Sequence, residues 1–203
     1  MNRLITFGCS LAYGHGLSDC FKQQNNEPGD VASELAFPAL IAKRLRLDNF
    51  NLSRPGASNK EIWNKAINFA YDATDTVIVH WSYPDRNIIY NDNGTETELA
   101  PWQDNDASRL FYKHFHSDIE ANNDFYLRLD QLNHFYKMFG IKVRFFVPRR
   151  SYYGVQPKWC LGHIMHYSIE EMSHSTNDFA LDDIHPGEKT HYNYTNELLT
   201  ILK

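Results

Sequence analysis

Short apolar runs recur along this chain, separated by longer segments in which apolar residues repeat every three or four positions. Most of the short runs are rich in β-branched and aromatic side chains, a pattern typical of strands that are buried on both faces of a parallel sheet. We therefore expect strands at residues 4–7, 50–53, 76–81 and 141–147.

The segments with helical periodicity predict helices between these strands. Ser58, followed three residues later by Glu61, is a capping box that marks the start of one of them. The helices are expected at residues 37–45, from about 59, at 108–139 with a break near 117, and after 186. Because strands and helices alternate, the sequence predicts an α/β fold with a parallel sheet.

Two long polar segments interrupt this alternation, at about residues 82–107 and 148–180. Connections of this length usually serve as binding loops or lids, and each follows the carboxyl end of a predicted strand. The length of 203 residues fits one domain, spanning 1–203, with a sizeable core.

Composition excludes some classes of partner. A net charge of −5 argues against a general nucleic-acid binder, which needs a basic face to neutralise phosphates. No apolar run approaches membrane-spanning length, and the first strand begins too close to Met1 to leave room for a signal peptide. An odd count of three cysteines predicts a reduced, cytoplasmic protein; a phage-encoded or virion-associated product would look the same.

Candidate chemistry lies at the two ends of the chain. The first strand ends at Gly8, and Ser10 follows in a sharp turn, which places its hydroxyl at the edge of the sheet where ligands collect. Near the other end, Asp182 precedes His185 by three residues, a spacing that lets the carboxylate orient the imidazole. We predict that Ser10 is a nucleophile, His185 its general base and Asp182 the orienting carboxylate.

Three segments together resemble conserved blocks of the GDSL or SGNH hydrolase family, in the same order: residues 8–11, 51–58 and 182–185. This resemblance implies a three-layer α/β/α sandwich with a mainly parallel, flavodoxin-like sheet, and ester hydrolysis without a cofactor. It also implies an oxyanion hole formed by the N–H groups of Ser10 and Gly56 and by an asparagine of a third block. Cys9 replaces the usual aspartate, and the third block is missing, so Ser82 is the expected substitute donor.

Other side chains near the predicted strand ends are candidates for binding substrate. Trp81 ends a strand, and Trp102 offers a stacking surface or else pins its loop to the body. Arg149 follows the last predicted strand, where it either holds an anionic part of the substrate or is simply solvated.

The sequence therefore predicts a serine esterase that cleaves a small or carbohydrate-linked ester. The main alternative is a binding module of weak or no activity that recognises a glycan or a protein. A metal-dependent hydrolase is a third hypothesis, suggested by the pairs 114/116 and 163/166 among ten histidines. Neither pair has the spacing of a known zinc helix, so no metal site is expected, and the sequence predicts no particular oligomeric state.

Overall fold

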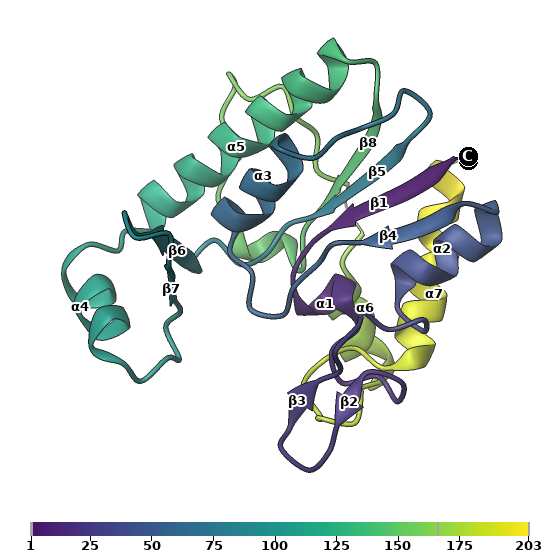
Figure 1. Ribbon diagram of the computed structural model, residues 1–203, viewed down its shortest axis with the longest axis horizontal. Helices are drawn as coiled ribbons and strands as arrows, with labels where there is room; N and C mark the ends of the chain where they lie inside the picture. The colour runs from purple at the N-terminus through teal and green to yellow at the C-terminus, as the bar shows by residue number, and fades with distance from the viewer. Residues whose placement is uncertain (1, 166, 203) are drawn as a thin grey trace.

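A parallel sheet forms the centre of the structure, a computed structural model that describes residues 2–165 and 167–202. Its four strands are β1 (Arg3–Phe7), β4 (Asp48–Asn51), β5 (Thr76–His80) and β8 (Lys142–Phe146). They lie in the order β4-β1-β5-β8, and every neighbouring pair is parallel (Figure 1). The mainly parallel sheet predicted from the sequence is thus confirmed.

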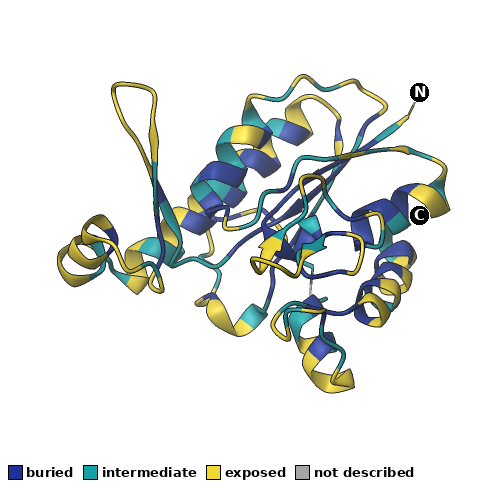
Figure 2. Cartoon of the chain, turned by 60° about the horizontal axis from the view of Figure 1, so that its bottom comes forward, coloured by how far each residue is buried: buried dark blue, intermediate teal, exposed yellow. Residues whose placement is uncertain are grey.

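Helices cover both faces of this sheet (Figure 1). On one face α3 (Asn59–Ile67) packs against α5 (Asp118–Met138), and on the other α2 (Phe37–Leu45) packs against α7 (Glu188–Leu202). Figure 2 shows the buried residues in the central strands and on the helix sides turned toward them. The molecule is therefore a three-layer α/β/α sandwich, as predicted, because each helix buries one apolar side against the sheet.

The strand order determines where a site can form. From β1, the chain crosses first to β4 on one side and then to β5 on the other, so the order reverses at the carboxyl end of β1. In open parallel sheets the loops diverge at such a point and leave a crevice for a ligand. An isolated parallel bridge between Phe145 and Ile164 extends the sheet beyond β8, as in flavodoxin-like folds.

The segment 82–107 differs from the long loop expected there. It contains an antiparallel hairpin of β6 (Asn87–Tyr90) and β7 (Glu96–Leu99), and α4 (Asp106–His114) begins near its end. The hairpin projects from the body and exposes its tip; Ile88 and Leu99 are buried, whereas Ile89 and Tyr90 are exposed (Figure 2). Sequence periodicity detects such a ribbon poorly because it buries little apolar surface.

The remaining elements are short. Residues 148–180, also expected to be irregular, contain a 3₁₀ turn (Arg150–Tyr152) and α6 (Ile169–Thr176). A small hairpin of β2 (Phe21–Lys22) and β3 (Glu27–Pro28) lies between β1 and α2 in the sequence. Within the described residues, every helix is too short or too polar to cross a membrane.

Candidate active site

Ser10 occupies the first position of a short helix, α1 (Ser10–Tyr13), directly after the turn that ends β1. The turn requires glycine at position 8, because a Cβ atom there would lie 2.7 Å from the Cβ of Ala12 and 3.1 Å from the carbonyl oxygen of His80. Ser10 thus starts a new element at the carboxyl end of the central strand. Its backbone N–H belongs to the first turn of α1, where no intrahelical partner is available.

His185 and Asp182 lie together in the loop before α7. The Asp182 Oδ1 atom accepts hydrogen bonds from the backbone N–H groups of Ile184 and His185, at 3.1 and 3.0 Å. The Nδ1–H of His185 donates to Asp182 Oδ2 at 2.6 Å, which leaves Nε2 as an acceptor. The backbone contacts hold the carboxylate still, so it fixes both the orientation and the tautomer of the imidazole.

The two ends of the chain meet at this histidine. The Oγ–H of Ser10 donates to His185 Nε2 at 2.9 Å, across 175 positions of sequence. Burial raises the pKa of Asp182, but its hydrogen bonds with His185 and Ile184 more than offset this effect and hold the pKa well below its ordinary value. The three side chains that the sequence singled out therefore form one continuous chain of hydrogen bonds, with a charged carboxylate at its far end.

Two hydrogen bonds hold the loop that carries His185 next to Ser10. The N–H of Leu181 donates to the carbonyl oxygen of Gly16 at 2.9 Å, which joins the loop after α1 to the loop that carries the histidine. Asp178 accepts a hydrogen bond from the N–H of Thr190 at 2.6 Å and so anchors the first turn of α7. These contacts tie the histidine loop at both of its ends.

Ser10 and His185 open into a pocket of about 840 Å³. Gly56 lies in its wall with φ of +81°, a conformation that other residues rarely adopt, so its backbone can approach a bound group closely. Trp102, one of the predicted substrate-binding residues, also lines this pocket. Other side chains in its wall are His15, Tyr83, Asp85, Arg86, Tyr152, Glu170, His174 and Phe179.

Ser82 is not placed where an oxyanion donor is needed, which corrects the sequence-based expectation. It is fully buried and does not line the pocket; its N–H donates to Asn59 Oδ1 at 2.7 Å, and its carbonyl oxygen accepts the hydroxyl of Tyr153. The reason is that the ladder continues past β5: the Trp81 N–H donates to the carbonyl oxygen of Phe146 at 2.8 Å. Ser82 consequently remains below the rim of the sheet.

Two predicted substrate-binding residues also lie elsewhere. Trp81 is fully buried and packs against the rings of Phe125 and Phe145, so it belongs to the core. Arg149 lies outside the pocket wall, with its Nε atom 4.0 Å from a carboxylate oxygen of Glu171. Position after a strand end indicated the correct side of the sheet but did not determine which side chains face the pocket.

The residues that sequence reasoning missed follow β5 and begin α6. The guanidinium of Arg86 lies over the rings of both Tyr83 and Trp102, 4.5 and 4.7 Å from their centres. The Tyr83 hydroxyl donates to Glu170, and burial together with neighbouring Glu171 raises the pKa of Glu170 to about 7. The signal in the sequence was the pair of charges at 85 and 86, in the segment that follows a buried strand.

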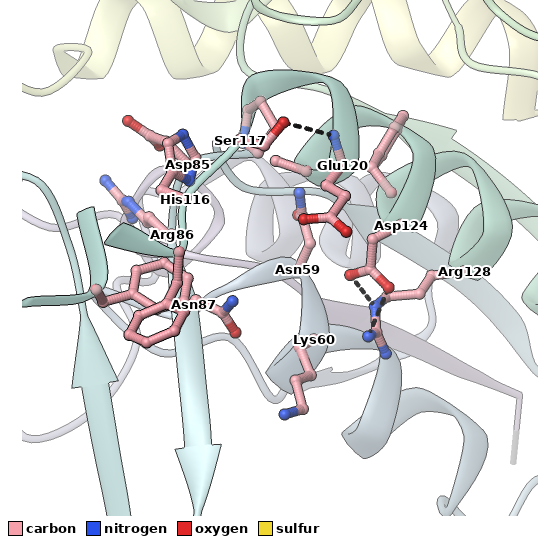
Figure 3. A pocket seen from close by; sticks show the side chains of 15 residues that line it. Asn59, Lys60, Asp85, Arg86, Asn87, His116, Ser117, Glu120, Asp124 and Arg128 are labelled. Atoms are coloured by element: carbon pink, nitrogen blue, oxygen red, sulfur yellow. Dashed lines mark hydrogen bonds and ion pairs between the residues drawn. The ribbon is translucent and has the colours of Figure 1, made fainter. Parts of the chain in front are cut away.

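A second, more polar hollow of about 350 Å³ adjoins the pocket and shares Asp85 and Arg86 with it (Figure 3). Figure 3 shows Asp124 and Arg128 paired on α5, at the wall opposite Arg86. Asp85 Oδ1 is buried and has no hydrogen-bond partner among the described residues, and burial raises the pKa of its carboxyl group. The hollow thus continues the pocket away from Ser10.

Of the two histidine pairs behind the metal hypothesis, the structure describes both members of the pair 114/116. His116 bonds to Asp118 at 3.0 Å, and His166 lies outside the described residues. Across residues 2–165 and 167–202, the residues grouped closely enough to share a metal ion are His15, Asp182 and His185.

Comparison with known proteins identifies the fold. No protein-family model and no curated protein matches the sequence. Among solved structures, an acetyl xylan esterase from the rumen bacterium Butyrivibrio proteoclasticus aligns with 14% identity and a TM-score of 0.60, over 99% of this chain and 63% of that one. A G-D-S-L family protein from Desulfitobacterium hafniense aligns with 10% identity and a TM-score of 0.53, over 99% of both chains.

A family two carbohydrate esterase from Clostridium thermocellum, solved in complex with cellohexaose, aligns with 13% identity and a TM-score of 0.53. That alignment covers 99% of this chain and 63% of the esterase, so the chain spans less than two thirds of both carbohydrate esterases. The chain has the α/β fold of the GDSL or SGNH hydrolases, which confirms the resemblance found in the sequence.

Proposed function

We propose that this protein is a serine esterase that cleaves a small or carbohydrate-linked ester. The observation that carries the proposal is the chain of hydrogen bonds from Ser10 Oγ through His185 to Asp182, at 2.9 and 2.6 Å. The 2.9 Å distance is within the range in which a proton passes from a nucleophile to its base, and the 2.6 Å hydrogen bond to Asp182 orients that base. The fold and its esterase neighbours support the same chemistry.

In the proposed reaction, His185 Nε2 accepts the proton of Ser10 as its Oγ attacks the ester carbonyl carbon. The charged Asp182 stabilises the imidazolium that forms. The N–H groups of Ser10 and Gly56 hold the tetrahedral oxyanion, and His185 then gives its proton to the leaving alcohol. Water, activated in turn by His185, hydrolyses the acyl-enzyme and releases the acid.

The lining of the pocket supports an ester whose alcohol part is a saccharide. Trp102 and Tyr83 offer aromatic faces, while Arg86, Asp85 and Glu170 offer hydrogen-bonding groups to hydroxyls. The adjoining hollow provides room for further sugar rings beyond the cleaved ester. An O-acetylated saccharide fits this combination of stacking surfaces and polar groups.

One observation favours the alternative of a weak enzyme that acts mainly as a binding module. Because Ser82 is buried, the oxyanion hole consists of two backbone donors and lacks the third that the family resemblance implied. Loss of one such donor lowers turnover by a factor on the order of 10² to 10³. A glycan would then bind in the same pocket with little hydrolysis.

The test combines labelling with turnover. A fluorophosphonate probe should label the wild-type protein at Ser10 and should not label Ser10→Ala. The same substitution should lower the rate of p-nitrophenyl acetate hydrolysis about a thousandfold. Hydrolysis by Ser10→Ala at the wild-type rate would refute the esterase assignment. Saccharide binding without labelling would favour the binding module.

A further inference from the structure

The side chain of His15 packs against that of His185, the proposed general base. The imidazole rings of His15 and His185 have their centres 4.5 Å apart, with 32° between their planes, and both line the pocket. The Nε2 atom of His15 is buried and has no hydrogen-bond partner among the described residues. A buried nitrogen without a partner is unfavourable, so it points to a ligand that the site can take up.

Asp182 completes a cluster with these two histidines. One ligand atom from each of His15, Asp182 and His185 can be chosen so that all three lie within 4.8 Å of one another. We propose that this cluster binds a divalent transition-metal ion, Zn²⁺ above all, and that the bound ion switches the esterase off. The inhibition rests on the proposed function, whereas the metal site itself does not.

The donor set determines which ions are suitable. Two imidazole nitrogens and one carboxylate oxygen suit Zn²⁺, whereas Mg²⁺ and Ca²⁺ prefer sites made only of oxygen ligands. Zinc bonds to nitrogen and oxygen are about 2.0–2.2 Å long, so the ligand atoms must approach one another by about 1 Å or more when the ion binds. His15 is half-buried between two buried glycines, Gly14 and Gly16, so this approach comes from rotation of its side chain and not from movement of the loop.

A metal ion on either nitrogen of His185 disables the base. On Nε2 it occupies the lone pair that would accept the Ser10 proton. On Nδ1 it displaces the ring proton to Nε2, which then cannot accept another, and it replaces the hydrogen bond to Asp182. In both cases no electrons are transferred and the ion leaves again when a chelator removes it.

The experiment compares wild-type protein with His15→Gln and with His174→Gln, a matched histidine that lines the same pocket outside the cluster. Zn²⁺ should inhibit p-nitrophenyl acetate hydrolysis by the wild type, with full recovery after chelation, and Mg²⁺ should not. His15→Gln should require at least tenfold more Zn²⁺ for half-inhibition, while His174→Gln should match the wild type. Equal zinc sensitivity in all three proteins would overturn the proposal and leave His15 as a packing residue.

A binding measurement separates this inference from the esterase assignment. Ser10→Ala keeps all three ligands, so calorimetric titration with Zn²⁺ should give one site per chain, whatever the activity. The double variant Ser10→Ala with His15→Gln should bind at least tenfold more weakly. If Ser10→Ala binds Zn²⁺ but the wild type proves to be no esterase, the proposed function fails and the metal site stands. If the double variant binds as tightly as Ser10→Ala, the site is wrong.

Discussion

Gly16 and Asp182 are packed so closely that a Cβ atom on the glycine would lie 2.8 Å from the carboxylate carbon. No side-chain atom fits there without moving the acid that orients His185. The loop around Gly16, which follows the helix that carries Ser10, therefore also supports Asp182.

We expect Gly16→Ala to lower kcat/KM by at least about tenfold. The added methyl group pushes the Asp182 carboxylate away from its place beside His185, and even a small misplacement of a catalytic group lowers the rate strongly. Gly94→Ala is the matched control: Gly94 has φ of +80°, close to the +88° of Gly16, but a Cβ atom there would meet nothing within 4 Å. Both variants should lose stability in thermal unfolding, Gly16→Ala more than Gly94→Ala because its Cβ atom also clashes, whereas only Gly16→Ala should lose activity. Equal activity in the two would show that Asp182 tolerates the shift.

Asp182→Asn should reduce kcat on the order of 10³-fold, because an amide cannot stabilise the imidazolium and favours the wrong tautomer of His185. Its neighbour Asp183 also lines the pocket but makes no hydrogen bond to His185 in the structure. Asp183→Asn should therefore stay within about threefold of the wild type. Steady-state kinetics on p-nitrophenyl acetate distinguish the two carboxylates, and a reversed order would transfer the orienting role to Asp183.

Acid should destabilise the fold through His80, which is fully buried at the end of β5 with both ring nitrogens unpartnered among the described residues. Burial lowers the pKa of His80 from 6.5 to about 4. As the pH falls, the imidazole of His80 is protonated in the unfolded chain before it is protonated in the folded one. The free energy of unfolding therefore falls as the pH drops from 6.5 toward 4. The full loss from this group is about 3 kcal/mol.

The measurement is urea unfolding of wild type and His80→Leu between pH 7 and 4.5. Glu170 acts in the opposite sense, because its raised pKa adds stability below about 4.5 that is lost as the pH rises through about 7. This contribution is common to both proteins and cancels in the difference between them. The free energy of unfolding of His80→Leu should rise relative to that of the wild type as the pH falls. A difference that does not change with pH would contradict the lowered pKa of His80.

Trp102→Ala should raise KM for an acetylated xylo-oligosaccharide roughly three- to tenfold. It removes an aromatic face on which a sugar ring can stack and also the contact between the indole and the Arg86 guanidinium. The kcat for p-nitrophenyl acetate should change less, since this ester carries no sugar rings to stack on the indole. Trp159→Ala is the control, because Trp159 is 51% exposed, similar to the 60% of Trp102, but lies outside the pocket. Equal effects of the two substitutions would place the saccharide elsewhere.

The sequence by itself determined the layers of the fold and the chemical groups at its two ends. Apolar runs and helical periodicity are local patterns, and they located α2 at 37–45, the start of α3 at Ser58 and Glu61, and the central strands. The turn at Gly8 and the spacing of Asp182 and His185 are equally local, so they could be found without coordinates. The hairpin at 87–99 could not, because its strands bury too little apolar surface to leave a pattern.

Only the tertiary structure decided which side chains face the pocket. Ser82, Trp81 and Arg149 all follow or end predicted strands, yet the first two are buried and the third faces Glu171. His15 and Arg86 reach the pocket because of packing with residues far away in sequence. Orientation at a strand end depends on where the hydrogen-bond ladder stops, and that is set by the neighbouring strand rather than by the local sequence.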